Sequence, residues 1–153
     1  MKKTKNPIKA AIRNAKAWYN YEILQTWEAG LLLEGVEVKL LRNGQGSLEG
    51  SYAIVERSGV WLIGSYIPAA DCRYPQHAPH RRRKLLLHKS EIRKLQSLLR
   101  DKGTTLIPLE IYFSEKGMAK IRIGLAKGKR EFDKRRTIQE REVNKRIKTR
   151  IHQ

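Results

Sequence analysis

The chain has 153 residues and a formal net charge of +18, from 33 Lys or Arg against 15 Asp or Glu. That length predicts one domain, and no apolar run approaches the roughly 18 residues of a membrane-spanning helix. The single cysteine excludes an intramolecular disulfide and fits a reducing compartment, and no apolar segment follows the basic start, so we expect a cytoplasmic protein.

The positive charge is segregated along the chain. Residues 1–20 hold six Lys or Arg and no acid, residues 81–102 hold nine against two acids, and residues 127–150 hold eleven against four. Residues 21–80 carry seven acids and four Lys or Arg. Because Lys and Arg neutralise phosphates and release condensed counterions, three basic flanks on a near-neutral body indicate a polyanionic partner. Nucleic acid fits better than a membrane, since no segment opposes a basic face with a large apolar one.

The first half of the chain predicts an arm followed by strands. Residues 1–13 are expected to form a basic N-terminal arm. Residues 21–27 are rich in β-branched and aromatic side chains and predict a strand, which Gly30 should interrupt as a bulge or bend before Leu31–Leu33 resume it. Residues 36–42 are ambiguous: their alternation favours a strand, whereas the bracketing glycines also suit a short helix.

Two hairpins follow from alternating patterns around glycine-containing turns. Residues 51–55 and 60–63 flank Ser58-Gly59, and residues 105–113 and 118–123 flank a turn that ends at Gly117. Pro108 predicts an edge or a bulge within the second hairpin.

Between the hairpins the pattern predicts a proline-marked loop, a basic run and one helix. The run is Arg81–Lys84, and the helix extends from about His88 to Lys102, with Gly103 as its stop. Its apolar stripe consists of Ile92, Leu95, Leu98 and Leu99. Five or six mostly antiparallel strands with an inserted helix predict a mainly β fold: an OB-like closed barrel, over residues 14–129, with peripheral helices.

Residues 130–153 change character and form the basic C-terminal tail. Val143, Ile147 and Ile151 recur every four residues among basic side chains, a stripe too narrow to bury against a barrel. One interpretation is an unstructured basic tail in the free protein. The other is a tail that becomes helical inside a negatively charged channel.

No constellation of residues predicts catalysis, so we expect a binding protein and not an enzyme, with no cofactor and no metal. Cys72, His77 and His80 lack a fourth ligand and fit no common zinc site. His88 is better explained as a helix cap or core neighbour than as a catalyst. Trp18 and Tyr19 either stack on bases or, in the case of Trp18, pack on the barrel; both interpretations stay open.

Several segments together, in order and spacing, resemble the bacterial tmRNA-binding small protein B family, also called SsrA-binding protein. They are Asn14–Ala17, Tyr21–Ile23, Glu28–Gly30, Gly35–Arg42, Arg83–His88, Gly124–Arg130 and Asp133–Arg135. The chain departs from the family pattern at four positions: Val36 and Leu40 replace a usual Thr and Ser, Ala78 a common Asp, and Tyr19 a frequent His that is thought to stack.

The resemblance implies an OB-type barrel that binds the tRNA-like domain of tmRNA, and a tail that enters the decoding site and mRNA channel of stalled ribosomes. The nascent peptide is then tagged for degradation and the ribosome is released. The implied partners are tmRNA, ribosomal RNA and, indirectly through alanyl-tmRNA, elongation factor Tu with GTP; the free protein is expected to be a monomer. By analogy Asn14, Glu28 and Leu86 contact RNA, and Asp133, Lys134 and Arg135 serve tagging.

Further basic and aromatic positions complete the expected sites. For RNA they are Lys16, Tyr19, Lys39, Arg42, Arg83, Lys84, Lys127 and Lys129, and for the ribosome Arg136, Arg141 and Lys145. Two alternatives differ in class: a ribosomal or assembly protein that holds rRNA with the same barrel, and, more remotely, an RNA-modifying enzyme. RNA recovered with the protein from a lysate separates all three.

Overall fold

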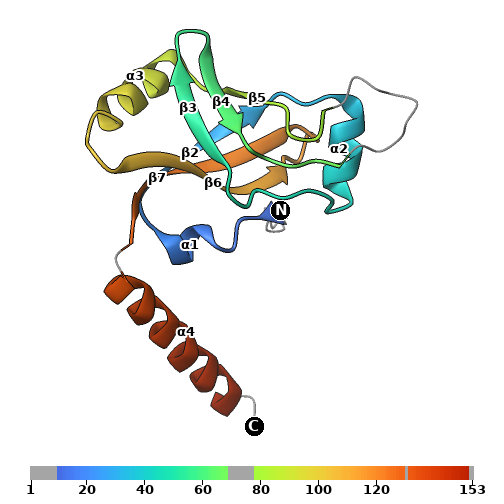
Figure 1. Cartoon of the computed structure of the whole chain (residues 1–153). Helices are drawn as coiled ribbons and strands as arrows, with labels where there is room; N and C mark the ends of the chain where they lie inside the picture. The colour runs from blue at the N-terminus through green and yellow to red at the C-terminus, as the bar shows by residue number, and fades with distance from the viewer. Residues whose placement is uncertain (1–9, 69–77, 130, 152–153) are drawn as a thin grey trace, which may run out of the picture.

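A computed structural model describes residues 10–68, 78–129 and 131–151. In chain order the elements are β1 (Ala10–Arg13), α1 (Ala17–Asn20), β2 (Tyr21–Leu31), α2 (Gly35–Arg42), β3 (Tyr52–Glu56), β4 (Gly59–Ile63), β5 (Arg83–Leu86), α3 (Lys89–Leu98), β6 (Thr104–Phe113), β7 (Ala119–Gly128) and α4 (Glu131–Ile151). The strands gather into one body, with α2 and α3 at its margins, and α4 projects from it beside α1 (Figure 1).

The strands close into an antiparallel ring. Hydrogen bonds connect β6, β3, β4, β5, β2 and β7 in that order, and β7 returns to β6, while β1 adds to the free part of β6. The weakest join is between β3 and β6, through Ala53 and Leu106 alone. This closed arrangement with peripheral helices confirms the predicted mainly β, OB-like fold.

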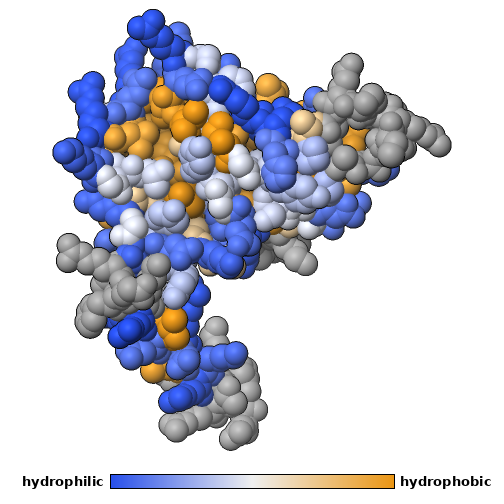
Figure 2. All heavy atoms as spheres, viewed as in Figure 1, coloured by the Kyte–Doolittle hydropathy of each residue, from blue (hydrophilic) through white to orange (hydrophobic). Residues whose placement is uncertain are grey.

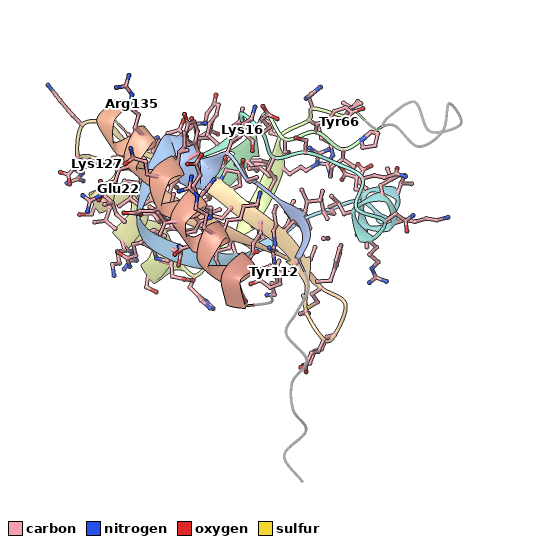
Figure 3. The ribbon with its side chains drawn as sticks, turned by 90° about the horizontal axis from the view of Figure 1, so that it is seen from below. Lys16, Glu22, Tyr66, Tyr112, Lys127 and Arg135 are labelled. Atoms are coloured by element: carbon pink, nitrogen blue, oxygen red, sulfur yellow. The ribbon has the colours of Figure 1, made fainter. Side chains whose placement is uncertain are left out.

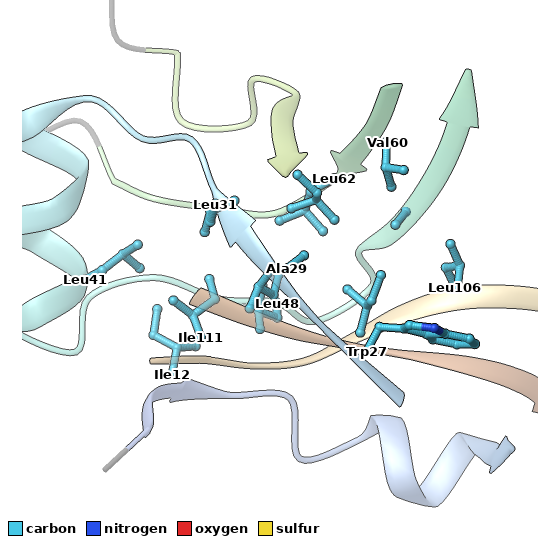
Figure 4. Packing of buried hydrophobic residues seen from close by; sticks show 14 of the residues in the cluster. Ile12, Trp27, Ala29, Leu31, Leu41, Leu48, Val60, Leu62, Leu106 and Ile111 are labelled. Atoms are coloured by element: carbon cyan, nitrogen blue, oxygen red, sulfur yellow. The ribbon is translucent and has the colours of Figure 1, made fainter. Parts of the chain in front are cut away.

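The core fills the inside of the ring (Figure 4). Alternate strand residues point inward, as period-2 patterning requires: on β7, Ile121 and Ile123 are fully buried, whereas Arg122 between them is exposed. The indole of Trp27 and the aliphatic side chains of Leu31, Leu62 and other residues of the remaining strands pack against them.

The first strand differs from the prediction. β2 runs unbroken from Tyr21 to Leu31, and its irregularity lies between Ile23 and Gln25, not at Gly30. Gly30 instead allows a close approach of neighbouring strands: a Cβ placed on it would lie 3.1 Å from the Cβ of Leu86 on β5. A glycine within a strand signals either a bulge or such an approach, and here it is the approach.

The ambiguous segment at 36–42 is a helix. Its buried side chains are Glu37, Leu40 and Leu41, at helical spacing. The Glu34 amide donates to the Glu37 carboxylate over 3.0 Å, which satisfies one of the amide groups left unpaired at a helix start. The helical spacing of buried residues therefore prevails over the apparent alternation.

Both predicted hairpins are confirmed, as β3–β4 and β6–β7, the second with longer strands than predicted. The register between β6 and β7 shifts between Pro108 and Glu110, so the bulge foreseen at Pro108 is present. α3 ends at Leu98, earlier than predicted, and Gly103 occupies the following turn with φ of +83°. Its predicted stripe is confirmed: Leu95 is fully buried, and the other three side chains pack against the core.

The two ends of the chain depart from expectation. Within the predicted arm, Ala10–Arg13 form β1, because Ile12 is only 8% exposed and anchors the segment to β6 and the core. The tail, expected to be unstructured in the free chain, forms the helix α4. Residues 131–151 contain neither Gly nor Pro, and Arg136 pairs with Glu140 one turn later over 3.4 Å.

The surface of α4 is mostly hydrophilic, with a few hydrophobic side chains (Figure 2). Its Arg135, Arg136, Arg141 and Lys145 are all exposed. Among the helices of the described residues, none combines the length and the apolar character needed to cross a membrane.

Candidate nucleic-acid interface

One outer surface of the barrel combines a carboxylate, an apolar side chain, an aromatic ring and cations. We call it the outer strand face: Glu28, Gly30, Trp61, Lys84, Leu86, Lys120 and Arg122. Strand register assembles it, since Gly30 lies between Lys120 and Leu86, Glu28 is opposite Arg122, and Lys84 is opposite Trp61. Leu86 is 50% exposed although its neighbour Leu85 is buried, so the surface offers an apolar contact to a partner.

Glu28 is held by a tyrosine two strands away. Tyr112 on β6 donates its hydroxyl hydrogen to the Glu28 carboxylate, passing beneath Arg122 of the intervening β7. The Arg122 guanidinium lies 5.6 Å from the Tyr112 ring centroid and donates to Glu110 over 2.7 Å. Burial, together with the bond to Glu28, raises the pKa of Tyr112 to about 12, so the hydroxyl remains a donor. Glu28 itself stays exposed and oriented.

Trp61, which belongs to this surface, and Arg82, which packs on its ring, were not predicted to contact RNA. The Arg82 guanidinium lies 4.4 Å from the Trp61 ring centroid and the Lys84 ammonium 5.8 Å from it. Glu56 accepts from Arg82 over 2.9 Å, and the indole N–H donates to Ser58 over 2.9 Å. An aromatic ring flanked by cations is a feature of nucleic-acid platforms. Only the β4–β5 register reveals this combination, because Trp61 is distant in sequence from Arg82 and Lys84.

Arg83 was predicted to contact RNA, and the structure contradicts this. Its side chain is fully buried and pairs with the fully buried Glu37 of α2 at 2.6 Å. The guanidinium also donates to the Ser65 hydroxyl over 2.8 Å and to the Pro79 carbonyl over 3.1 Å. A strand alternates its side chains, so one member of the basic run must point inward.

This buried pair joins α2 to β5. Burial alone opposes the charge of Glu37, but hydrogen bonds from Arg81, the Glu34 amide and Arg83 outweigh it and hold the pKa of Glu37 below its ordinary value. Since every charge is hydrogen-bonded, the pair fixes the position of α2 on the barrel.

Asn14 is also largely buried, at 7% exposure. Its side-chain amide donates to the Pro108 carbonyl over 2.9 Å, directly beside the β6 bulge. The side chain therefore braces the start of α1 against β6, and any contact that it makes with RNA depends on the segment that it positions.

A second group of predicted residues lies in or near α1, and Figure 3 labels two of them, Lys16 and Lys127. Lys16 and Lys127 are exposed; Lys16 pairs with Glu49 over 2.7 Å, which raises the pKa of Lys16, and Lys127 is opposite Glu22. Lys129 donates from its ammonium to the Trp18 carbonyl over 2.8 Å. Trp18 is 49% exposed, so half of its surface is accessible for stacking, and Tyr19 beside it is partly exposed.

The remaining predicted residues lie on other elements. Lys39 and Arg42 are exposed on α2, where Arg42 donates to the Gly117 carbonyl over 3.3 Å and lies 5.1 Å from the Phe113 ring centroid. Asp133 and Lys134 lie in α4, but their side chains are outside the described residues. The expected residues thus divide among the outer strand face, the α1 region, α2 and α4.

One cysteine and three histidines were considered for a metal site or a helix cap. Cys72 and His77 lie outside the described residues, and the His80 ring is 5.1 Å from that of Tyr66. Within the described residues no three potential ligands cluster for a metal ion. His88 occupies the cap position of α3, and its amide donates to Glu91 over 3.1 Å.

Known proteins resemble this chain over most of its length. The family model described as SmpB protein matches residues 11–153. SsrA-binding proteins of Allorhizobium ampelinum and Leifsonia xyli subsp. xyli are each 49% identical over 138 residues, which are 90% of this chain and 87% of each relative. A solved structure described as "tmRNA-SmpB: a journey to the center of the bacterial ribosome" has a TM-score of 0.67 and 45% identity, covering 82% of this chain and 87% of that one.

Proposed function

Because the chain belongs to the SmpB protein family, we propose that it binds the tRNA-like domain of tmRNA and delivers it to stalled ribosomes in trans-translation. The observation that carries this proposal is the likeness, over 82% of the chain, to a tmRNA-SmpB structure at 45% identity. The protein acts by binding, without catalysis or a cofactor, as a cytoplasmic monomer when free.

The outer strand face supports RNA binding because its groups match what unpaired RNA offers. Glu28 is oriented to accept hydrogen bonds from base amino groups. Trp61 presents an aromatic surface with two cations beside it, and Leu86 offers an apolar contact. Bases stack and phosphates pair on such a surface.

The tail supports a separate role on the ribosome. As a helix of 21 residues, α4 extends about 32 Å at 1.5 Å per residue. Its exposed Arg135, Arg136, Arg141 and Lys145 repel one another in free solution, and rRNA phosphates neutralise them in the decoding site and mRNA channel. Elongation factor Tu with GTP is an indirect partner, through alanyl-tmRNA.

The RNA-binding proposal is tested by titrating the full chain with a transcript of the tRNA-like domain. We expect Leu86→Ala to weaken binding about tenfold, equivalent to about 1.4 kcal/mol, with an unchanged melting temperature. Leu24→Ala is the matched control, because Leu24 is 47% exposed on β2 but outside the outer strand face. Equal binding by both variants contradicts the assignment of this face.

The dependence on salt tests the electrostatic part. If about 6–10 phosphates are neutralised, a plot of log K against log salt concentration should have a negative slope of several units. Each neutralised phosphate contributes roughly 0.7–0.9 to that slope. A slope near zero contradicts a polyanionic partner. RNA recovered from a lysate must contain tmRNA, and enrichment of rRNA without tmRNA favours an assembly protein instead.

A further inference from the structure

A cleft between the barrel and α4 brings three arginines from distant parts of the chain to one place. Arg13 comes from β1, Arg122 from β7 and Arg141 from α4. The cleft has a volume of about 380 Å³, within the range of about 300–1,000 Å³ typical of small-ligand sites. Its other lining residues are Asn14, Ala15, Trp18, Leu109 and Glu110.

The charges of the lining favour an anion. Among its described residues, Glu110 is the only carboxylate, and it already binds Arg122 at 2.7 Å and approaches Arg13 at 4.0 Å. One carboxylate thus orients two guanidinium groups without neutralising the site, which keeps a net charge of about +2 when Arg141 is included. Planar guanidinium groups hold phosphate oxygens through paired hydrogen bonds.

The walls of the cleft favour a ligand that has an aromatic group as well as a negative charge. Trp18 lines it with an indole that is 49% exposed, and Leu109 and Ala15 contribute apolar surface. A simple inorganic anion uses the arginines but not the ring, whereas a nucleotide uses both, its base on the indole and its phosphate on the arginines.

We propose that this cleft holds a single nucleotide of unpaired RNA, stacked on Trp18 with its phosphate between Arg122 and Arg141. The inference rests on the proposed function and adds a specific consequence. Because Arg122 belongs to the barrel and Arg141 to the tail helix, the bound nucleotide joins α4 to the barrel in one orientation. RNA binding then orients the tail.

The test uses the full chain with Trp61→Phe, so that Trp18 is the only exposed tryptophan beside the buried Trp27. Hexauridylate, which forms no stable secondary structure, should quench the indole fluorescence saturably as a base stacks. Arg141→Ala in this background should weaken the interaction several-fold and lower the salt slope by about 0.7. Arg146→Ala removes the same charge from an exposed site on the same helix, outside the lining of the cleft, and should leave both the binding constant and the salt slope nearly unchanged.

The tRNA-like domain serves as the second probe and separates the two sources of RNA. Quenching by both RNAs assigns the nucleotide to tmRNA, and quenching by hexauridylate alone assigns it to unpaired RNA of the ribosome. Absence of quenching by either RNA, while the tRNA-like domain still binds, overturns the cleft inference and leaves the proposed function standing. Failure of the unmodified chain to bind the tRNA-like domain overturns the proposed function. Equal effects of Arg141→Ala and Arg146→Ala also overturn the cleft inference.

Discussion

The hydroxyl of Tyr112 donates a hydrogen bond to the carboxylate of Glu28 across an intervening strand. Tyr112 is 5% exposed, whereas Glu28 faces solvent. Glu28 is therefore both a candidate RNA contact and the acceptor for a buried donor. A loss of RNA binding after its substitution has two separable causes.

Two substitutions of Glu28 should separate these causes. Glu28→Ala leaves the Tyr112 hydroxyl without its acceptor, and we expect a loss of about 1–3 kcal/mol in the free energy of unfolding. Glu28→Gln keeps an acceptor oxygen and should stay closer to the wild-type stability. Both should weaken binding of the tRNA-like domain. Urea denaturation and RNA titration give the two readouts, and wild-type binding by Glu28→Gln shows that the charge is not what the RNA contacts.

The raised pKa of Tyr112 predicts a change of stability at high pH. The folded pKa of about 12 lies above the ordinary value of 10.0, so the stability from the protonated hydroxyl is fully present below pH 10. It is lost as the pH rises from 10 through about 12. Tyr112→Phe should flatten this part of the curve of unfolding free energy against pH. Tyr52→Phe, at an exposed site, keeps Tyr112 and should keep the slope.

The buried pair of Glu37 and Arg83 should be the most sensitive polar element of the barrel. Glu37→Gln leaves the fully buried guanidinium without a counter-charge, and we expect a loss of about 3–5 kcal/mol. The double variant Glu37→Gln/Arg83→Met should lose less than the two single variants together, because neither charge remains unpaired. Additive losses in chemical denaturation refute coupling between the two side chains.

Glu37 also predicts the response to acid. Its folded pKa is below the ordinary value of 4.5, so its stabilising effect is present above pH 4.5 and is lost as the pH falls through the folded pKa. Glu37→Gln should therefore reduce the loss of stability below pH 4.5. Glu49→Gln, at the exposed pair with Lys16, is the control that should leave most of the acid dependence in place. An unchanged acid slope in Glu37→Gln contradicts the assignment.

The barrel was predictable where local signals agree. The β3–β4 and β6–β7 hairpins combine alternation with glycine turns, and the Pro108 bulge follows from a missing amide hydrogen. Gly30 was misread because its close neighbour, Leu86, is distant in sequence and only the pairing of β2 with β5 brings them together.

The candidate site was less predictable than the fold, because charge alone does not say which side of a strand a residue occupies. Four cations in Arg81–Lys84 looked equivalent, yet one is fully buried against Glu37. Trp61 becomes a candidate RNA contact only when the β4–β5 register places cations beside its ring. The tail's basic charge and narrow apolar stripe favoured an unstructured segment, whereas residues 131–151, which contain neither Gly nor Pro, form the helix α4.

Removal of residues 130–153 should leave the barrel folded, because among the described residues the buried hydrophobic core lies in the preceding chain, between Ile12 and Ala126. The truncated protein should bind the tRNA-like domain at reduced affinity, since Arg141 is lost from the cleft. It should not support peptide tagging in a reconstituted reaction on ribosomes stalled at the end of an mRNA, because no helix remains to occupy the channel.

The triple variant Asp133→Ala/Lys134→Ala/Arg135→Ala refines this prediction. It keeps Arg141 in the cleft. The helix α4 should also persist, because alanine, which replaces the three residues, is the best helix former. We therefore expect nearly wild-type binding of the tRNA-like domain together with a loss of tagging. Its binding should exceed that of the truncated protein, and the difference should shrink at high salt because it comes from charge. Normal tagging by either protein shows that α4 is only a solvated basic extension.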